Sequence, residues 1–82
     1  MAELNRVVIV TGGGTGVGRE TSLAMGRLGY HVVVNYSRSQ GEAEQTVQEL
    51  TALGVRAFAY QADVGDDAAC RAMVAFTVQE LG

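Results

Sequence analysis

The sequence predicts an α/β fold in which three βα units form a parallel sheet. Three short apolar runs alternate with segments of helical period, and a glycine-rich turn follows the first run. Parallel strands require crossover connections, and a helix is the usual connection. Such crossovers are almost always right-handed. No repeat, charge block or linker interrupts the 82 residues. We therefore expect one structural unit in which strand and helix alternate throughout.

The first βα unit begins with the apolar run Val7-Val8-Ile9-Val10, which predicts a strand over residues 6–11. After the glycines, apolar and small side chains recur at i, i+4, i+7, i+8 and i+11, the spacing of one helix face. The residues that we expect on this buried face are Val17, Thr21, Ala24, Met25 and Leu28. Gly29 is expected to end the helix in the left-handed conformation.

The second unit has a strand over residues 31–36, and its run Val32-Val33-Val34 is apolar on both faces, as in a central parallel strand. A helix opens near Ser39, because Ser39 and Glu42 have the spacing of a capping box. Gly54 closes this helix. Its expected buried stripe is Ala43, Val47, Leu50 and Leu53.

The third unit combines a strand over residues 55–62 with a helix that begins near Asp66 and Asp67. Carboxylates at this point suit the positive end of the helix dipole, so we expect them to stabilise the helix rather than to join Asp63 in a metal site. The apolar residues of this helix are Ala69, Met73 and Phe76, with Cys70, Val74 and Leu81 close by.

The glycine-rich turn, residues 11–18, has the composition of a phosphate-binding loop. The pattern G-x-G-x-x-G is absent, and so is the triphosphate loop G-x-x-x-x-G-K-[ST], because the chain contains no lysine. Gly12 permits a tight turn out of the strand, Gly16 lets the backbone approach a phosphate, and Gly18 lets the helix pack closely. The helix N-terminus would attract the anion. The alternative is a flexible loop without a ligand.

The pattern Thr-Gly-x-x-x-Gly-x-Gly, formed by Thr11, Gly12, Gly16 and Gly18, resembles the short-chain dehydrogenase/reductase family. The resemblance implies the N-terminal half of a doubly wound Rossmann fold, with strand order 3-2-1-4. Residues 1–82 would then be the N-terminal part of a single dinucleotide-binding domain. The residues of the turn that the resemblance assigns to the cofactor are Gly12, Gly14, Thr15, Gly16, Val17 and Gly18.

The end of the second strand favours NADP(H) over NAD as the cofactor. An acidic residue about 20 residues past the glycines binds the ribose diol of NAD, and here Asn35 takes that position, followed by Tyr36, Ser37 and Arg38. A neutral amide, a hydroxyl and a guanidinium are compatible with a 2′-phosphate. Members with this preference often carry a basic residue where this chain has Thr15. The alternative is that Arg38 is a solvated loop residue.

Two further residues follow the third strand. Asp63 and Val64 resemble the family's Asp-Val pair, which implies contacts to the adenine ring. Their position agrees with binding beyond the carboxyl ends of parallel strands. The alternative is that Asp63 caps the turn or the next helix.

The catalytic residues of the resembled family are not found in this sequence. The family uses an Asn-Ala-Gly segment, a Ser and a Tyr-x-x-x-Lys pair, whereas Tyr36 and Tyr60 are followed four residues later by Gln40 and Val64. The resemblance therefore implies the cofactor-binding part of an NADP(H)-dependent oxidoreductase that reduces a carbonyl or oxidises an alcohol, most similar to 3-oxoacyl-carrier-protein reductases. We expect the chain to be a fragment of a longer protein. The alternative is a non-catalytic dinucleotide-binding module or sensor.

Composition narrows the partners and the location. The net charge of −3 disfavours nucleic acid and anionic membranes. One cysteine and one histidine make neither a disulfide framework nor a zinc site, so we expect Cys70 to pack and His31 to lie at the strand boundary. Apolar runs are too short for a membrane span or a signal peptide. We expect a cytoplasmic protein that acts on a small carbonyl or alcohol and forms a homo-oligomer at full length.

Overall fold

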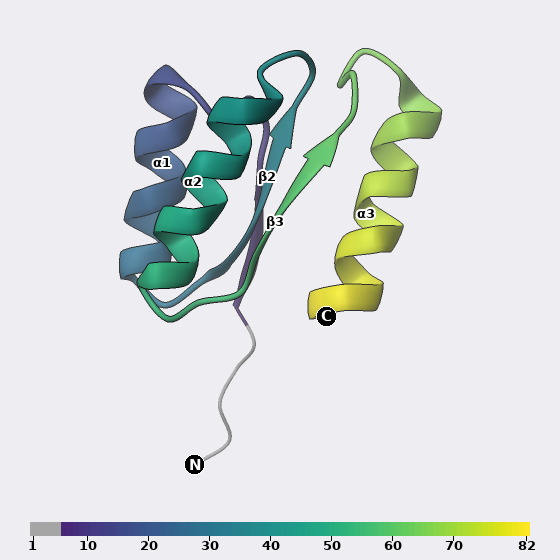
Figure 1. The fold of residues 1–82 in the computed structure, drawn as a ribbon. Helices are drawn as coiled ribbons and strands as arrows, with labels where there is room; N and C mark the ends of the chain where they lie inside the picture. Colours follow the sequence, from purple (N-terminus) through teal and green to yellow (C-terminus); the bar gives the residue numbers. More distant parts are fainter. Residues whose placement is uncertain (1–5) are drawn as a thin grey trace.

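The computed structural model describes residues 6–82 and has the predicted alternation of strands and helices (Figure 1). The first strand is one residue shorter at each end than expected, and the third begins two residues later and ends one residue earlier. The elements are β1 (Val7–Val10), α1 (Gly16–Arg27), β2 (His31–Tyr36), α2 (Gln40–Ala52), β3 (Ala57–Gln61) and α3 (Asp67–Leu81).

The three strands form one parallel sheet with β2 in the centre, in the order β1-β2-β3. This is the part of the predicted order that three strands can form. Val10 at the end of β1 pairs with Val34, and Asn35 near the end of β2 pairs with Tyr60. The carboxyl ends of all three strands therefore meet at one edge of the sheet, where the glycine-rich turn also lies.

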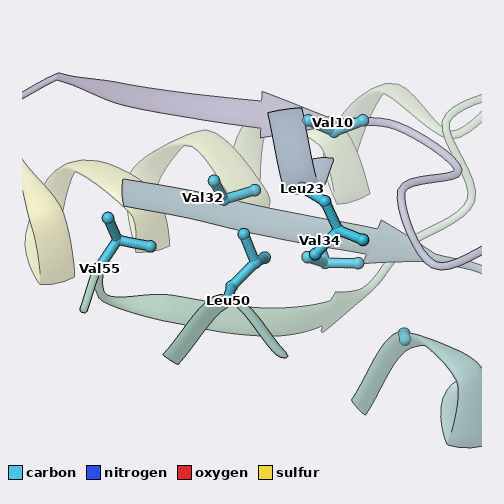
Figure 2. Close-up of a cluster of buried hydrophobic side chains, with 7 residues drawn as sticks. Val10, Leu23, Val32, Val34, Leu50 and Val55 are labelled. Carbon is cyan, nitrogen blue, oxygen red and sulfur yellow. The ribbon is translucent and has the colours of Figure 1, made fainter. Parts of the chain in front are cut away.

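Helices cover both faces of the sheet. In Figure 1, α1 and α2 lie side by side on one face, and α3 lies on the other. Val32 and Val34 point toward the α1–α2 side and pack with Leu23 and Leu50 (Figure 2). Val33 points the opposite way and packs with the apolar side chains of α3. The alternation of side chains along a strand explains why all three valines are fully buried, as the sequence predicted.

The buried face of α1 differs from the predicted one. Val17 is 84% exposed and Leu28 is 68% exposed, and Thr21 and Ala24 are exposed as well. The residues that α1 buries are Ser22, Leu23 and Gly26. A 3.6-residue period specifies a helix, but here it fits two different faces. The small residues Ser22 and Gly26 let α1 approach the sheet and α2 more closely than the predicted face, with its larger side chains, would.

The predicted helix ends are confirmed at three of four positions. Gly29 and Gly54 follow α1 and α2 with φ of 93°, and Asp66 caps α3 by accepting a hydrogen bond from the Ala69 amide at 3.2 Å. The predicted capping box at Ser39 is wrong, because the Ser39 side chain makes no capping hydrogen bond. Its φ and ψ of −91° and 61° are not the extended backbone that a capping serine uses.

The buried stripe of α2 is also shifted. Ala43 and Leu50 are fully buried as predicted, but the third buried residue is Thr46, while Val47 is half-buried and Leu53 is 45% exposed. A polar residue takes the inner position because its hydroxyl has acceptors there, as described below. None of the helices in residues 6–82 has the length and apolar character that crossing a lipid bilayer requires.

Candidate functional site

A pocket lies at the carboxyl ends of β1 and β2, between the glycine-rich turn and the start of α2. It brings together most of the residues that the sequence singled out at these two places. Its lining consists of Gly12, Gly14, Thr15, Asn35, Tyr36, Ser37, Arg38 and Ser39. Ser39 was interpreted only as a helix cap. Its position directly after Arg38 is the signal that could have placed it in the pocket.

The backbone of the turn needs glycine for two different reasons. Gly12 and Gly16 have φ of 62° and 53°, a backbone conformation that residues other than glycine rarely adopt. A Cβ on Gly16 would meet nothing within 4 Å, so the space beside it is open. Gly18 faces the opposite situation, because its Cβ would overlap the carbonyl of Gly12. Gly18 thus lets α1 start directly against the turn.

The N-terminus of α1 is not capped from within the protein. Thr15 is extended, makes no side-chain capping hydrogen bond, and no acidic residue stands in the first turn. Among residues 15–19, Arg19 is the first whose amide donates to a backbone carbonyl, that of Thr15 at 3.1 Å. The amides before it point out of the helix end, as the first-turn amides of any helix do. The N-terminus of α3, in contrast, has Asp66 as its cap. The N-terminus of α2 also lacks a capping hydrogen bond, but it has the acidic Glu42 in its first turn. The end of α1 therefore has neither a cap nor a carboxylate that would compete with an external anion.

The carbonyl groups of the turn are bound to the helices instead. The Ser22 hydroxyl donates to the Gly13 carbonyl at 3.1 Å, and the single proton of the Thr46 hydroxyl is shared between the Glu42 carbonyl at 3.0 Å and the Gly14 carbonyl at 3.2 Å. Ser22 belongs to α1 and Thr46 to α2, and both side chains are fully buried. With these acceptors occupied, the turn presents less negative partial charge to the pocket. Sequence reasoning missed both residues, since their partners in the turn lie 9 and 32 residues away.

Asn35 lies at the inner end of the pocket and is only 2% exposed. Its Oδ1 accepts from the Gly12 amide at 3.3 Å, and its Nδ2 donates to the Ala62 and Tyr60 carbonyls at 3.0 and 3.3 Å. The side chain on which the cofactor prediction rested is therefore engaged by the protein itself. Other polar side chains at this end of β2 include those of Ser37 and Arg38, which also line the pocket.

Ser37 and Arg38 are exposed where β2 gives way to α2. The ion pairs formed within residues 6–82 engage Arg19 and Arg71, with Glu20, Glu49 and Asp67, and do not include Arg38. The Arg38 guanidinium is a planar donor that matches a phosphate group in two-point contact. This corner of the pocket therefore carries a positive charge and a hydroxyl.

The remaining predicted residues do not line the pocket. Gly16 and Val17 border a shallow apolar depression on the outer side of α1. Asp63 and Val64 follow β3 and are exposed. The Asp63 carboxylate accepts from the Gly65 amide at 2.8 Å, which is a turn contact and leaves its other oxygen at the surface. Within residues 6–82, no three His, Cys, Asp or Glu side chains are grouped so that they could hold a metal ion.

Comparison with known proteins gives the family. The model of the short chain dehydrogenase family matches residues 6–82. The short-chain dehydrogenase/reductase homolog YusS of Bacillus subtilis is 45% identical over 82 residues, and the 3-oxoacyl-[acyl-carrier-protein] reductase FabG of Staphylococcus aureus is 39% identical over 80 residues. A dehydrogenase from Burkholderia cenocepacia, solved with bound NADP, superimposes with a TM-score of 0.89 at 27% identity over 95% of this chain. The chain belongs to the short-chain dehydrogenase family.

The extent of these matches differs between the relatives. The chain covers 75% of the length of YusS. It covers 32% of the S. aureus reductase and 31% of the B. cenocepacia dehydrogenase. The described residues thus correspond to one part of the longer relatives, the part with the glycine-rich turn and the first three strands.

Proposed function

We propose that this chain is the cofactor-binding part of an NADP(H)-dependent short-chain oxidoreductase that reduces a carbonyl group or oxidises an alcohol. One observation carries the proposal. Thr15, which directly precedes the uncapped N-terminus of α1, and the exposed Ser37–Arg38 pair line the same pocket, so that helix end and a second group suited to phosphate lie close together. NADP differs from NAD by the 2′-phosphate for which this second group is suited.

The residues present include a suitable partner for each phosphate of NADP. The amides of Gly16, Val17 and Gly18 would bind the pyrophosphate, and the open space beside Gly16 would hold its oxygens. Ser37 and Arg38 would bind the 2′-phosphate, because a hydroxyl and a guanidinium donate to it without charge repulsion. Asp63 and Val64 would border the adenine ring from the end of β3. When bound, the cofactor supplies or takes up the hydride, and this chain holds it.

The substrate class follows from the relatives only as a proposal. Those with named activities include a 3-oxoacyl-[acyl-carrier-protein] reductase and versicolorin reductase 1, which favours a small carbonyl compound or the corresponding alcohol. General acid catalysis of that reaction needs a tuned proton donor beside the substrate oxygen. Neither Tyr36 nor Tyr60 has a lysine four residues on, so we assign no catalytic residue here. A homo-oligomer in the cytoplasm remains our expectation.

Cofactor choice is tested by exchanging the charge at the two exposed residues. We expect the double variant Ser37→Asp, Arg38→Leu to lose NADPH affinity at least about tenfold and to keep NADH affinity, because a charged phosphate contact contributes about 1.5–3 kcal/mol. Arg71→Leu, which removes an exposed arginine of α3, is the matched control and should change neither affinity. The measurement is calorimetric titration of the natural protein. Equal loss of both cofactors, or no loss of NADPH, would contradict the assignment of Ser37 and Arg38.

A second candidate function is a non-catalytic dinucleotide-binding module. The relative YusS favours this function, because its match to the 82 residues of this chain covers 75% of the length of YusS. The absence of lysine from these 82 residues also favours it. The two functions differ in turnover. The test is to mix the natural protein with NADPH and each member of a panel of 3-oxoacyl thioesters, ketones and aldehydes. Binding of NADPH without its oxidation by any of these compounds would support a non-catalytic module.

A further inference from the structure

We propose that Asn35 is a positioning residue that fixes the glycine-rich turn relative to the end of β3, and thereby sets where the pyrophosphate binds. This inference rests on the proposed function. It differs from the reading of the sequence, in which Asn35 itself stood beside the 2′-phosphate.

Asn35 holds two consecutive amides of the turn. Its side-chain Oδ1 accepts from Gly12 at 3.3 Å, and its backbone carbonyl accepts from Gly13 at 2.9 Å. β1 ends at Val10, so these two bonds continue its attachment to β2 after regular pairing has stopped. Gly12 is also in the left-handed conformation. The side chain of Asn35 therefore fixes the residue at which the turn changes direction.

The same side chain holds the end of β3. Nδ2 donates to the carbonyls of Ala62 and Tyr60, and the Ala62 amide in turn donates to the Tyr36 carbonyl at 3.0 Å. Asp63 and Val64, the proposed neighbours of the adenine ring, follow directly. One buried side chain thus joins the two segments between which the cofactor would lie.

Only a carboxamide of this length fits the three partners. It offers an acceptor to Gly12 and donors to two carbonyls at once. Aspartate would keep the acceptor but bring a second oxygen against Tyr60 and Ala62, and an apolar side chain would leave all three partners without their bonds. Among the side chains of residues 6–82, every buried polar atom has a hydrogen-bond partner, so the network around Asn35 is complete as it stands.

The test uses the natural protein, the variant Asn35→Ala and two ligands. NADPH contacts both the turn and the Ser37–Arg38 pair, whereas adenosine 2′-monophosphate has no pyrophosphate. We expect Asn35→Ala to lower the affinity for NADPH at least about tenfold and the affinity for adenosine 2′-monophosphate less than about threefold. Hydrogen exchange should accelerate at least about tenfold at the Gly12 amide, which loses its side-chain acceptor, and much less at Gly13, whose acceptor is backbone.

Two further variants keep the test decisive. Thr77→Ala removes another buried hydrogen bond, to the Met73 carbonyl in α3, and should lower stability without altering either affinity. If Asn35→Ala does not fold, Asn35→Leu takes its place, because leucine has a similar branched shape and can make none of the three hydrogen bonds, and the same pattern of ligand affinities and of hydrogen exchange is expected. Equal weakening of both ligands, or unchanged NADPH affinity, would overturn the positioning role alone. Absence of NADPH binding by the unaltered protein would overturn the proposed function.

Discussion

Gly16 combines two properties that together make it the most sensitive residue of the turn. Its φ of 53° excludes most side chains, and the space that a Cβ would enter is open. Glycine adopts this conformation without a Cβ penalty. The open space beside Gly16 is where we propose that the backbone approaches a phosphate.

Replacing Gly16 by valine should abolish dinucleotide binding, because the side chain would fill the space proposed for the pyrophosphate. Backbone strain alone would also lower stability, so the control is Gly54→Val, where φ is 93° and the space beside the Cβ is equally open. We expect both variants to lose stability in urea unfolding and only Gly16→Val to lose NADPH affinity, measured by calorimetry. A folded Gly16→Val variant with unchanged affinity would rule out phosphate binding at this turn.

At this scale the sequence predicted the residue types of the site better than their contacts. The glycine pattern and the Ser37–Arg38 pair are local, and a reader of the sequence finds them within a few residues. The partners of Asn35 lie 23, 25 and 27 residues away. They are brought together by strand register, which the sequence pattern does not specify residue by residue. The same holds for Thr46, whose partner Gly14 is 32 residues away.

At the scale of elements, α1 was predicted correctly as a helix and wrongly in its orientation. Val17, Thr21, Ala24 and Leu28 keep a helical period but face outward. Two residues of α1 at which a Cβ would overlap a neighbour are glycines, Gly18 against the turn and Gly26 against Leu50. Glycines carry no hydrophobic signal in a periodicity argument. Strand alternation was more informative, because β2 is apolar on both faces and so has only one possible position, the centre.

The contact between α1 and the turn predicts a strong effect at Gly18. Gly18→Ala should destabilise the protein by about 1–3 kcal/mol, because its methyl group would meet backbone atoms of Gly12 and Gly13 that have no room to move. Gly41→Ala in α2, where a Cβ meets nothing within 4 Å, should instead stabilise by about 0.5–1 kcal/mol. Urea unfolding measures both. A Gly18→Ala variant as stable as Gly41→Ala would mean that α1 is not seated on the turn.

At the scale of the whole molecule, residues 6–82 form a sheet with helices on both faces and apolar surface left over. Within these residues β1 pairs only with β2. Leu28, which directly follows α1, is 68% exposed, and Val78 on α3 is 64% exposed. Large exposed apolar patches and unprotected strand edges favour association.

An isolated polypeptide of residues 1–82 should therefore self-associate and should oxidise no NADPH, since we assign it no proton donor. Leu28→Gln with Val78→Gln should lower the associated fraction in light scattering, because these side chains are exposed and their replacement removes no core packing. A monodisperse 1–82 polypeptide with measurable carbonyl reduction would contradict both the surface argument and the absence of catalytic residues.

We propose that the turn and the Ser37–Arg38 pair form one site for NADP(H). The most direct measurement is a calorimetric titration of the purified natural protein with NADPH and, separately, with NADH under the same conditions. One charged phosphate contact corresponds to at least about a tenfold difference in affinity. We expect NADPH to bind at least about tenfold more tightly than NADH. Equal or tighter binding of NADH, or no binding of either, would contradict this proposal.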